Sequence, residues 1–162
     1  MKWFGGRLGG HAGIETDSNF VIDFLPRGDL HIFSHKTKRH SKFTTHTRTS
    51  FFELFGGQKD SVSFTSITIP ISERQKEILD SLSGEYRKNS PYDYAFFGMR
   101  CGAATYDLLA KIGILSQYSE RKTWRKIFYP RKLRRRLTKI AMQNGWAIEN
   151  QKGSARRKWE RE

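Results

Sequence analysis

Cysteine, proline and long apolar runs are all scarce in this chain of 162 residues, which has 1 Cys and 4 Pro. A single cysteine cannot form an internal disulfide, so the fold cannot depend on oxidation. No apolar run approaches the length of a membrane-spanning helix, and residues 1–10 lack the apolar segment of a secretory signal peptide. We therefore expect a soluble protein, cytoplasmic by default, with export by other means left open.

Acidic residues are also scarce, and the resulting charge is unevenly distributed. The chain has 30 Lys and Arg against 16 Asp and Glu, a net charge of +14, and residues 121–162 alone carry +12. Such a segment attracts nucleic acid, an anionic membrane surface or an acidic polymer through the same long-range electrostatics. The candidate anion-binding residues are the clustered cations of a predicted helix: Arg131, Lys132, Arg134, Arg135, Arg136 and Lys139.

Aromatic residues are abundant, with 12 Phe, 6 Tyr and 4 Trp, and they predict a packed core. The length suits one principal domain over residues 1–120. Residues 121–162 are expected to form a basic helical extension that docks in part, with residues 149–162 frayed and solvated.

Strand signals dominate the first half of the chain. The runs HAGIET and NFVIDFLP flank residues 17–19 and predict a hairpin, with His11 opposite Asp23 and on the same strand face as Gly13 and Glu15. DLHIFSHKTKRH, residues 29–40, predicts a third strand, and SVSFTSITI, residues 61–69, predicts another.

Helix signals follow in the second half. Ser72 and Gln75 have capping-box spacing, and a buried face is predicted from the apolar side chains of Ile78, Leu79, Leu82 and Tyr86. A further helix is predicted from Pro130 to the Asn144–Gly145 stop signal, with one apolar side formed by Leu133, Leu137 and Ile140. Strands followed by helices indicate an α+β fold.

The only cysteine, Cys101, opens a third predicted helix, over Gly102–Ile112. A thiol in the first helical turn lies near unpaired backbone N–H groups, whose partial positive charge favours the thiolate. The alternative interpretation is that Cys101 is a small buried apolar residue.

Two histidines, His31 and His35, are four residues apart, a spacing that binds metal when it occurs on a helix. In the predicted strand they have no cysteine or carboxylate cluster beside them, so we expect solvated histidines and no metal site.

Together, a strand histidine, a nearby carboxylate and a helix-start cysteine are the parts of a thiol nucleophile, its base and an orienting group. GHAGIE around His11, with the later PYDYAFFGMRC, resembles the circularly permuted papain-like cysteine hydrolases of the NlpC type, particularly the YiiX-like branch. In that group the histidine precedes the cysteine, as here, whereas ordinary papain-like enzymes have the reverse order. The resemblance implies a permuted papain-like fold, with an antiparallel sheet packed against helices and the nucleophilic cysteine at a helix N-terminus.

Carried over to this chain, the resemblance makes Cys101 the nucleophile and His11 the base. The third position corresponds to Asp23, with Glu15 as the alternative. The family's Tyr-Asp element corresponds to Tyr92 and Asp93, which support the site or brace the loop before the helix. After the cysteine the chain reads GAATYDLL, where the family has Ser-Glu.

The function this implies is a cysteine hydrolase or acyltransferase without cofactor or metal. Its substrate would be an amide or ester: a peptidoglycan-type peptide, another amide, or a lipid acyl group. The alternative is a non-enzymatic protein that binds nucleic acid or an anionic surface through its basic C-terminal region. Aromatic residues interleaved with the cations support that alternative, because they suit stacked bases: Trp124, Phe128, Tyr129, Trp146 and Trp159.

Overall fold

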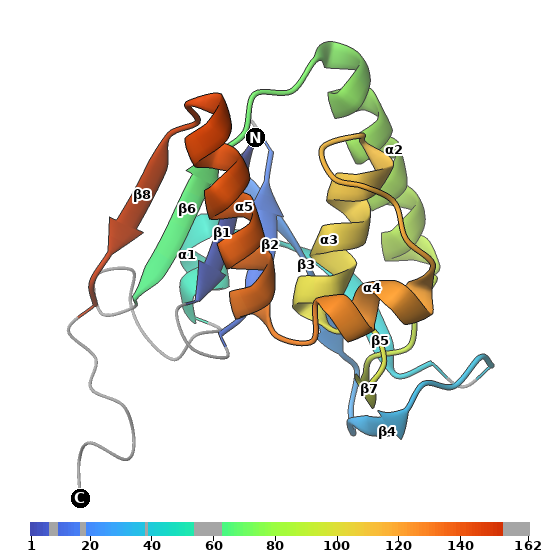
Figure 1. Cartoon of the computed structure of the whole chain (residues 1–162). Helices are drawn as coiled ribbons and strands as arrows, with labels where there is room; N and C mark the ends of the chain where they lie inside the picture. The colour runs from blue at the N-terminus through green and yellow to red at the C-terminus, as the bar shows by residue number, and fades with distance from the viewer. Residues whose placement is uncertain (7–9, 17–18, 38, 54–62, 154–162) are drawn as a thin grey trace, which may run out of the picture.

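A six-stranded antiparallel sheet forms the centre of the computed structural model, which describes residues 1–6, 10–16, 19–37, 39–53 and 63–153 (Figure 1). The strand order is β5-β3-β2-β1-β6-β8, and every neighbouring pair is antiparallel. The strands are β1 (Lys2–Gly6), β2 (Ala12–Glu15), β3 (Phe20–Pro26), β5 (Ser41–Thr47), β6 (Phe64–Thr68) and β8 (Ile148–Gln151).

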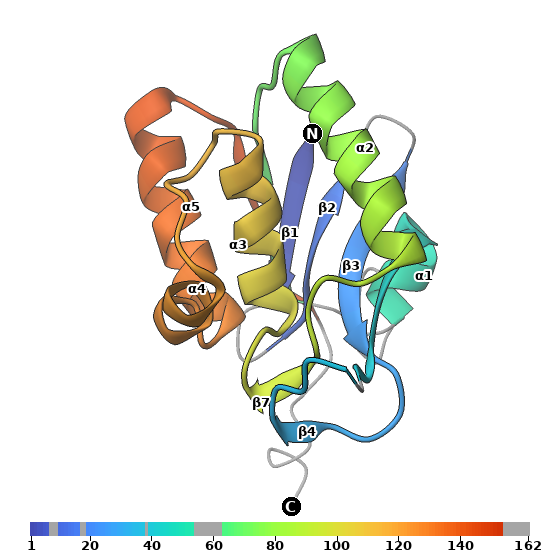
Figure 2. The ribbon, with the colours of Figure 1, turned by 90° about the vertical axis from the view of Figure 1, so that its right-hand side faces the viewer.

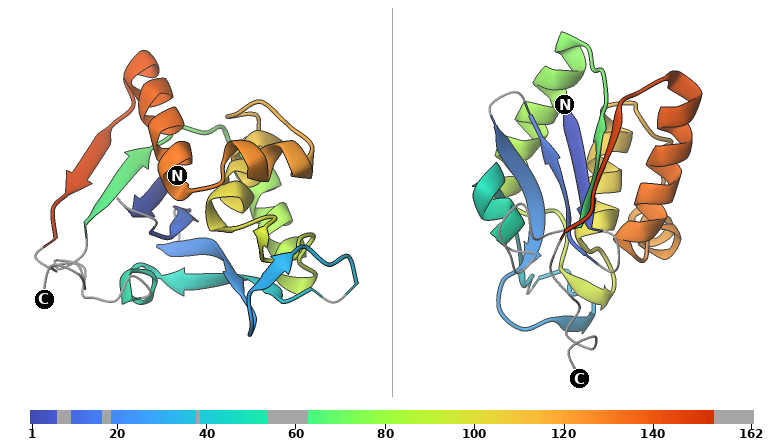
Figure 3. Two further views of the ribbon diagram at one scale, coloured as in Figure 1. Left: turned by 60° about the horizontal axis from the view of Figure 1, so that its bottom comes forward. Right: turned by 90° about the vertical axis from the view of Figure 1, so that its left-hand side faces the viewer.

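Helices cover both faces of this sheet. Helices α2 (Glu73–Lys88), α3 (Cys101–Lys111) and α5 (Pro130–Asn144) lie on one face, and α1 (Arg48–Glu53) lies on the other (Figures 2 and 3). Neighbouring residues of β1 divide between the two cores, since Trp3 packs in the larger cluster and Phe4 in the smaller one. The chain is therefore a mixed α+β protein with an antiparallel sheet packed against helices.

The predicted hairpin forms as β2 and β3, but its register differs from the prediction. Asp23 lies opposite Gly13, and His11 stands just before β2. The shift is two residues, which leaves Asp23 on the predicted strand face because side chains alternate with a period of two. Residues 17 and 18 of the predicted turn lie outside the described residues.

The predicted strand over residues 29–40 is wrong in length. Of its described residues, 29–37 and 39–40, β4 (His31–Phe33) alone forms a strand, and it pairs in parallel with β7 (Ala95–Phe97) as a separate two-stranded sheet. The Asp93 carboxylate accepts hydrogen bonds from the backbone N–H groups of His35, at 2.8 Å, and His40, at 2.7 Å. These bonds turn the chain around one side chain, so it cannot continue as a strand.

Helix α2 confirms its predicted capping box, in which the Ser72 side chain accepts from the Gln75 backbone and the Gln75 side chain accepts from Ser72 N–H. The buried face of α2 differs from the prediction at Ile78. Leu79 is buried, but Ile78 is 36% exposed, and Ser83 is buried instead. Ser83 can be buried because its hydroxyl donates to the Leu79 carbonyl oxygen, which satisfies the polar group.

Helix α5 begins at Pro130 and ends before Gly145, whose φ of 65° is the left-handed C-cap conformation that the sequence predicts. Its buried side chains belong to the same core cluster as those of α3. The close approach of the two helices requires a glycine, because a Cβ at Gly102 would lie 3.1 Å from the Pro130 Cα. A shorter helix that the sequence did not predict, α4 (Glu120–Lys126), precedes α5.

The chain after α5 returns to the sheet. Trp146 and Ile148, in the extension expected to dock in part, pack against the core, but residues 149–151, predicted to be frayed, belong to β8. Side-chain hydrogen bonds from β6 reach Glu149, at 3.0 Å, and Asn150, at 2.8 Å. Residues 154–162 lie outside the described residues. Among the helices that the structure describes, none is both long and apolar enough to cross a membrane.

Candidate active site

The candidate nucleophile Cys101 is the first residue of α3 and is 6% exposed. Its sulfur accepts hydrogen bonds from the backbone N–H of Ala12 and from the Tyr94 hydroxyl. It also forms a hydrogen bond with the His11 imidazole. The Tyr94 oxygen also accepts from the Cys101 backbone N–H. The thiol thus lies where the start of α3 meets the start of β2.

The imidazole of His11 connects this thiol to a buried carboxylate. Its Nε2 lies 2.6 Å from Oδ2 of Asp23, whose side chain is 0% exposed. With Nε2 engaged, Nδ1 is the nitrogen that remains for Cys101. Hydrogen bonds therefore connect Cys101 to His11 and His11 to Asp23, although Cys101 and His11 are ninety residues apart in the sequence.

The electrostatics of this arrangement favour an ion pair. Burial would raise the pKa of the Cys101 thiol, but the His11 charge and the hydrogen bonds to the sulfur outweigh it, so this pKa lies below its ordinary value. Burial would lower the pKa of His11, but the Cys101 thiolate and the Asp23 carboxylate raise it to about 10. Both shifts point to a thiolate beside an imidazolium at neutral pH.

The alternative third residue, Glu15, does not contact His11 in the described hydrogen bonds. It forms a bidentate ion pair with Arg48, with both N···O distances at 2.7 Å. The hydrogen bonds to Glu15 raise the pKa of the Arg48 guanidinium. Partial burial acts in the opposite direction but does not outweigh them. The geometry therefore places Asp23, rather than Glu15, next to the base.

The two supporting residues, Tyr92 and Asp93, lie in the segment that leads to α3 but contact other groups. The Tyr92 hydroxyl donates to the Asp107 carboxylate on α3. Asp93 accepts from the His31 ring, at 2.6 Å, and from two backbone N–H groups. Both residues fix the course of the segment before Cys101, whereas the thiol itself contacts His11, Ala12 and Tyr94.

Two residues near the candidate site, Tyr94 and His46, were missed by sequence reasoning. Nε2 of His46 lies 3.4 Å from Oδ1 of Asp23. Alternation along β5 would have placed His46 on the Asp23 face had the pairing of β3 with β5 been predicted, because Thr44 lies opposite Asp23. Tyr94 had a weaker signal, its place beside the Tyr-Asp element, and only the fold brings its hydroxyl to the sulfur.

The six candidate anion-binding residues of α5 are not equivalent. Arg131, Lys132, Arg135 and Lys139 are exposed, whereas Arg134 and Arg136 are partly buried. The Arg136 guanidinium lies over the rings of Tyr106, at 5.3 Å, and Tyr118, at 5.7 Å. Four of the six cations are thus presented to solvent.

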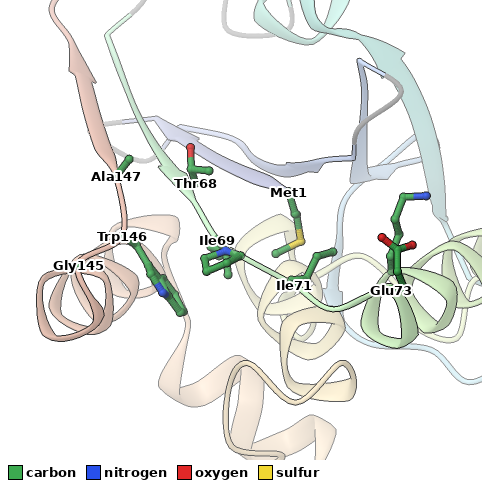
Figure 4. A pocket seen from close by; sticks show the side chains of 10 residues that line it. Met1, Thr68, Ile69, Ile71, Glu73, Gly145, Trp146 and Ala147 are labelled. Carbon is green, nitrogen blue, oxygen red and sulfur yellow. The ribbon is translucent and has the colours of Figure 1, made fainter.

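A pocket of about 400 Å³ lies at the end of the molecule opposite to Cys101, between the start of α2 and the turn after α5 (Figure 4). Its lining is mixed: the apolar side chains of Met1, Ile69, Ile71 and Trp146 lie beside the charged groups of Glu73 and Lys76. It contains no thiol or imidazole. Within the described ranges, no group of three or more His, Cys, Asp or Glu residues could hold a metal ion.

Comparisons with known proteins add no relative. No family model, curated protein or solved structure matches the chain.

Proposed function

We propose that the protein is a cysteine hydrolase or acyltransferase that acts on an amide or ester through Cys101, His11 and Asp23. The observation that carries this proposal is the His11 imidazole lying between a buried carboxylate, at 2.6 Å, and the only thiol of the chain. A thiol of purely structural role needs no such partners. The start of α3 adds to the case, since a helix N-terminus stabilises a thiolate.

In the proposed reaction the Cys101 thiolate attacks the carbonyl carbon of the substrate. The carbonyl π electrons move to oxygen and give a tetrahedral oxyanion. When this collapses, His11 donates its proton to the departing amine or alcohol, and a thioester remains on Cys101. Water or another acceptor then attacks the thioester while His11 takes the proton of that acceptor, which restores the thiolate and imidazolium.

Tyr94 is the proposed second donor to the oxyanion, beside the Cys101 backbone N–H. Its hydroxyl contacts both the sulfur and that N–H, so it lies where the negative oxygen would develop. Burial and the neighbouring thiolate raise the pKa of Tyr94. The phenol therefore keeps its proton at neutral pH and can donate it in a hydrogen bond.

The proposed fold type is a circularly permuted papain-like one of the NlpC kind. The order of His11 before Cys101, the antiparallel sheet and the helix that begins at Cys101 support it. The substrate proposed within this class is a peptidoglycan-type peptide, another amide or a lipid acyl group.

Reaction with p-nitrophenyl butyrate tests the proposed chemistry. We expect a burst of p-nitrophenol, an acyl group on the peptide that contains Cys101, and continued turnover as the thioester is hydrolysed. His11→Ala should lower the acylation rate by about 100-fold or more, because the thiol loses the imidazolium that keeps it as the reactive thiolate at neutral pH. Cys101→Ser serves as the control that should carry no thioester. Acylation of Cys101 no faster than that of free cysteine at the same pH would rule the proposal out.

A second candidate function, binding of nucleic acid or another anionic polymer, is favoured by one observation. The exposed cations Arg131, Lys132, Arg135 and Lys139 lie on a single helix. If this helix binds polyanions, R135E/K139E should elute from heparin at a clearly lower salt concentration than the wild type. Unchanged elution would exclude α5 as the binding surface.

A further inference from the structure

Exposed apolar side chains gather at the end of the molecule where the small β4–β7 sheet lies. We call this surface the end patch and define it by six residues, of which the last is half-buried and the others are exposed: Ile32, Phe33, Phe96, Phe97, Tyr129 and Phe128. On β4, Ile32 is 64% and Phe33 is 67% exposed, and Tyr129 after α4 is 50% exposed. Side chains of this size are normally buried, so a cluster of them in water indicates a binding surface.

Ring contacts join the five aromatic residues of the end patch, although they come from three distant segments; Ile32 neighbours Phe33 on β4. The ring of Phe97 stacks on Phe33, with centroids 5.5 Å apart, and Phe96 contacts both Phe97, at 4.9 Å, and Phe128, at 5.6 Å. Phe128 in turn contacts Tyr129, at 4.8 Å. The β4–β7 sheet that carries four of these residues projects at one end of the molecule, beyond the start of α3 (Figures 1 and 2).

The end patch is held in a fixed position by polar contacts beneath it. The buried Asp93 carboxylate ties the His31 ring of β4 to the segment that continues into β7. Arg100 backs the aromatic part, with its guanidinium 4.0 Å from the Phe128 ring centroid and 5.3 Å from that of Tyr129. Because Arg100 precedes Cys101, the patch lies close to the candidate nucleophile in the fold.

Positive charge borders the end patch. Within four residues of its members along the chain lie five exposed cations, against a single exposed carboxylate, that of Asp29. The cations are Lys36, Arg125, Lys126, Arg131 and Lys132. This border attracts an anionic partner, and it would repel a second copy of the same patch, since the whole chain carries +14.

We propose that the end patch docks on the interface of an anionic lipid bilayer, with its apolar side chains among the lipid chains and its cations at the headgroups. Apolar insertion combined with a basic border is the composition of interfacial membrane-binding surfaces. Aromatic residues suit the boundary between headgroups and acyl chains. The phosphates of a nucleic acid would attract the cations, but they would offer no apolar surface to Ile32. The proposal does not depend on the chemistry of Cys101.

Sedimentation with lipid vesicles tests this docking. We expect the full chain to bind vesicles of phosphatidylcholine mixed with phosphatidylglycerol, and to bind pure phosphatidylcholine far more weakly. The I32S/F33S variant should lower partitioning onto the mixed vesicles by about tenfold or more, because two inserting side chains are lost. Circular dichroism should stay unchanged, since both side chains are mostly exposed.

Phe20→Ser is the matched control. Phe20 is 46% exposed but begins β3, at the opposite end of that strand from the segment leading to β4, so its replacement should leave partitioning unchanged. Equal partitioning of I32S/F33S and the wild type would overturn the proposal and assign any vesicle binding to the basic residues alone. No partitioning by the wild type would also overturn it. So would a dimer in sedimentation velocity that I32S/F33S abolishes in the absence of vesicle binding.

Discussion

His11–Asp23 and His31–Asp93 are histidine–aspartate pairs with the same short ring-to-carboxylate distance, and they differ in what surrounds them. In both, the ring nitrogen lies 2.6 Å from a carboxylate oxygen of a side chain that is 0% exposed. The side chains of His11 and His31 are also similarly accessible, at 12% and 16% exposed. The pair alone therefore does not distinguish a catalytic site from a structural one.

The two pairs differ in the group that lies beside the histidine ring, in addition to the aspartate. His11 faces the Cys101 thiol, and the thiolate is the main contribution that raises the pKa of His11 against the effect of burial. His31 instead lies beside the rings of His35 and His40, with centroids 4.3 Å and 4.1 Å away.

The two carboxylates differ in the same way. The Asp93 carboxylate accepts hydrogen bonds from two backbone N–H groups in addition to its contact with the His31 ring. Burial would raise the pKa of Asp93, but these bonds outweigh it and hold the pKa below its ordinary value. Within the described part of the chain, the Asp23 carboxylate instead contacts the rings of His11 and His46. One pair adjoins the Cys101 thiol, and the other holds a loop.

The largest contrast is expected from removing each histidine in turn. His11→Ala should lower the rate of Cys101 alkylation by iodoacetamide near pH 6 about 100-fold, because loss of the imidazolium raises the thiol pKa and leaves less thiolate to react. His31→Ala should leave the rate within about twofold. Both alkylation rates are measured by quenching the labelling reaction at timed intervals and quantifying modified Cys101 by mass spectrometry. Equal rates in His11→Ala and the wild type would mean that the two pairs are both structural.

The Asp93 side of the comparison predicts an effect on stability. Asp93→Ala should reduce the free energy of unfolding by about 2–4 kcal/mol, because three donors lose one buried acceptor. Its lowered pKa gives the pH dependence: the contribution is fully present above the ordinary value of 3.8 and is lost as pH falls through the folded value. Urea unfolding between pH 7 and pH 3 measures this, and folded Asp93→Ala should keep its alkylation rate. An unfolding free energy equal to that of the wild type at pH 7 would contradict the role of Asp93 as a brace.

A third test concerns the proton on His11. Because its folded pKa of about 10 lies above the ordinary 6.5, protonation of His11 stabilises the fold fully below pH 6.5, and this contribution is lost as pH rises toward 10. NMR titration of the His11 ring should show a midpoint near 10. Cys101→Ala should lower it, since the thiolate is gone, whereas the His31 resonance should not respond to that variant. A His11 midpoint unaffected by Cys101→Ala would refute the ion pair.

The smallest effects separate the two candidates for the third site residue. Asp23→Asn should reduce the alkylation rate about tenfold, because the imidazolium loses its charged partner. Glu15→Gln should change it less than about twofold, since Glu15 is paired with Arg48. The same iodoacetamide assay decides between them. A larger loss in Glu15→Gln than in Asp23→Asn would reverse the assignment.

Local signals in the sequence predicted several elements correctly. The capping box at Ser72, the N1 proline at Pro130 and the glycine stop at Gly145 each act within one or two turns, so they can be read without the fold. The β2–β3 hairpin was also local, and its alternation placed Asp23 on the predicted face although the register was off by two residues. The strand over residues 29–40 failed because a side chain more than fifty residues later, that of Asp93, turns that segment.

For the candidate site, the sequence by itself determined the inventory: one thiol, a histidine at the edge of a hairpin and a carboxylate on the facing strand. The tertiary structure decided which groups meet. It paired Glu15 with Arg48, turned Tyr94 toward the Cys101 sulfur and set Asp93 on a second histidine. It also gathered the end patch from three segments. The physical reason is that hydrogen bonds and pKa shifts depend on distances of a few ångströms across the packed sheet and helices, which sequence separation does not encode.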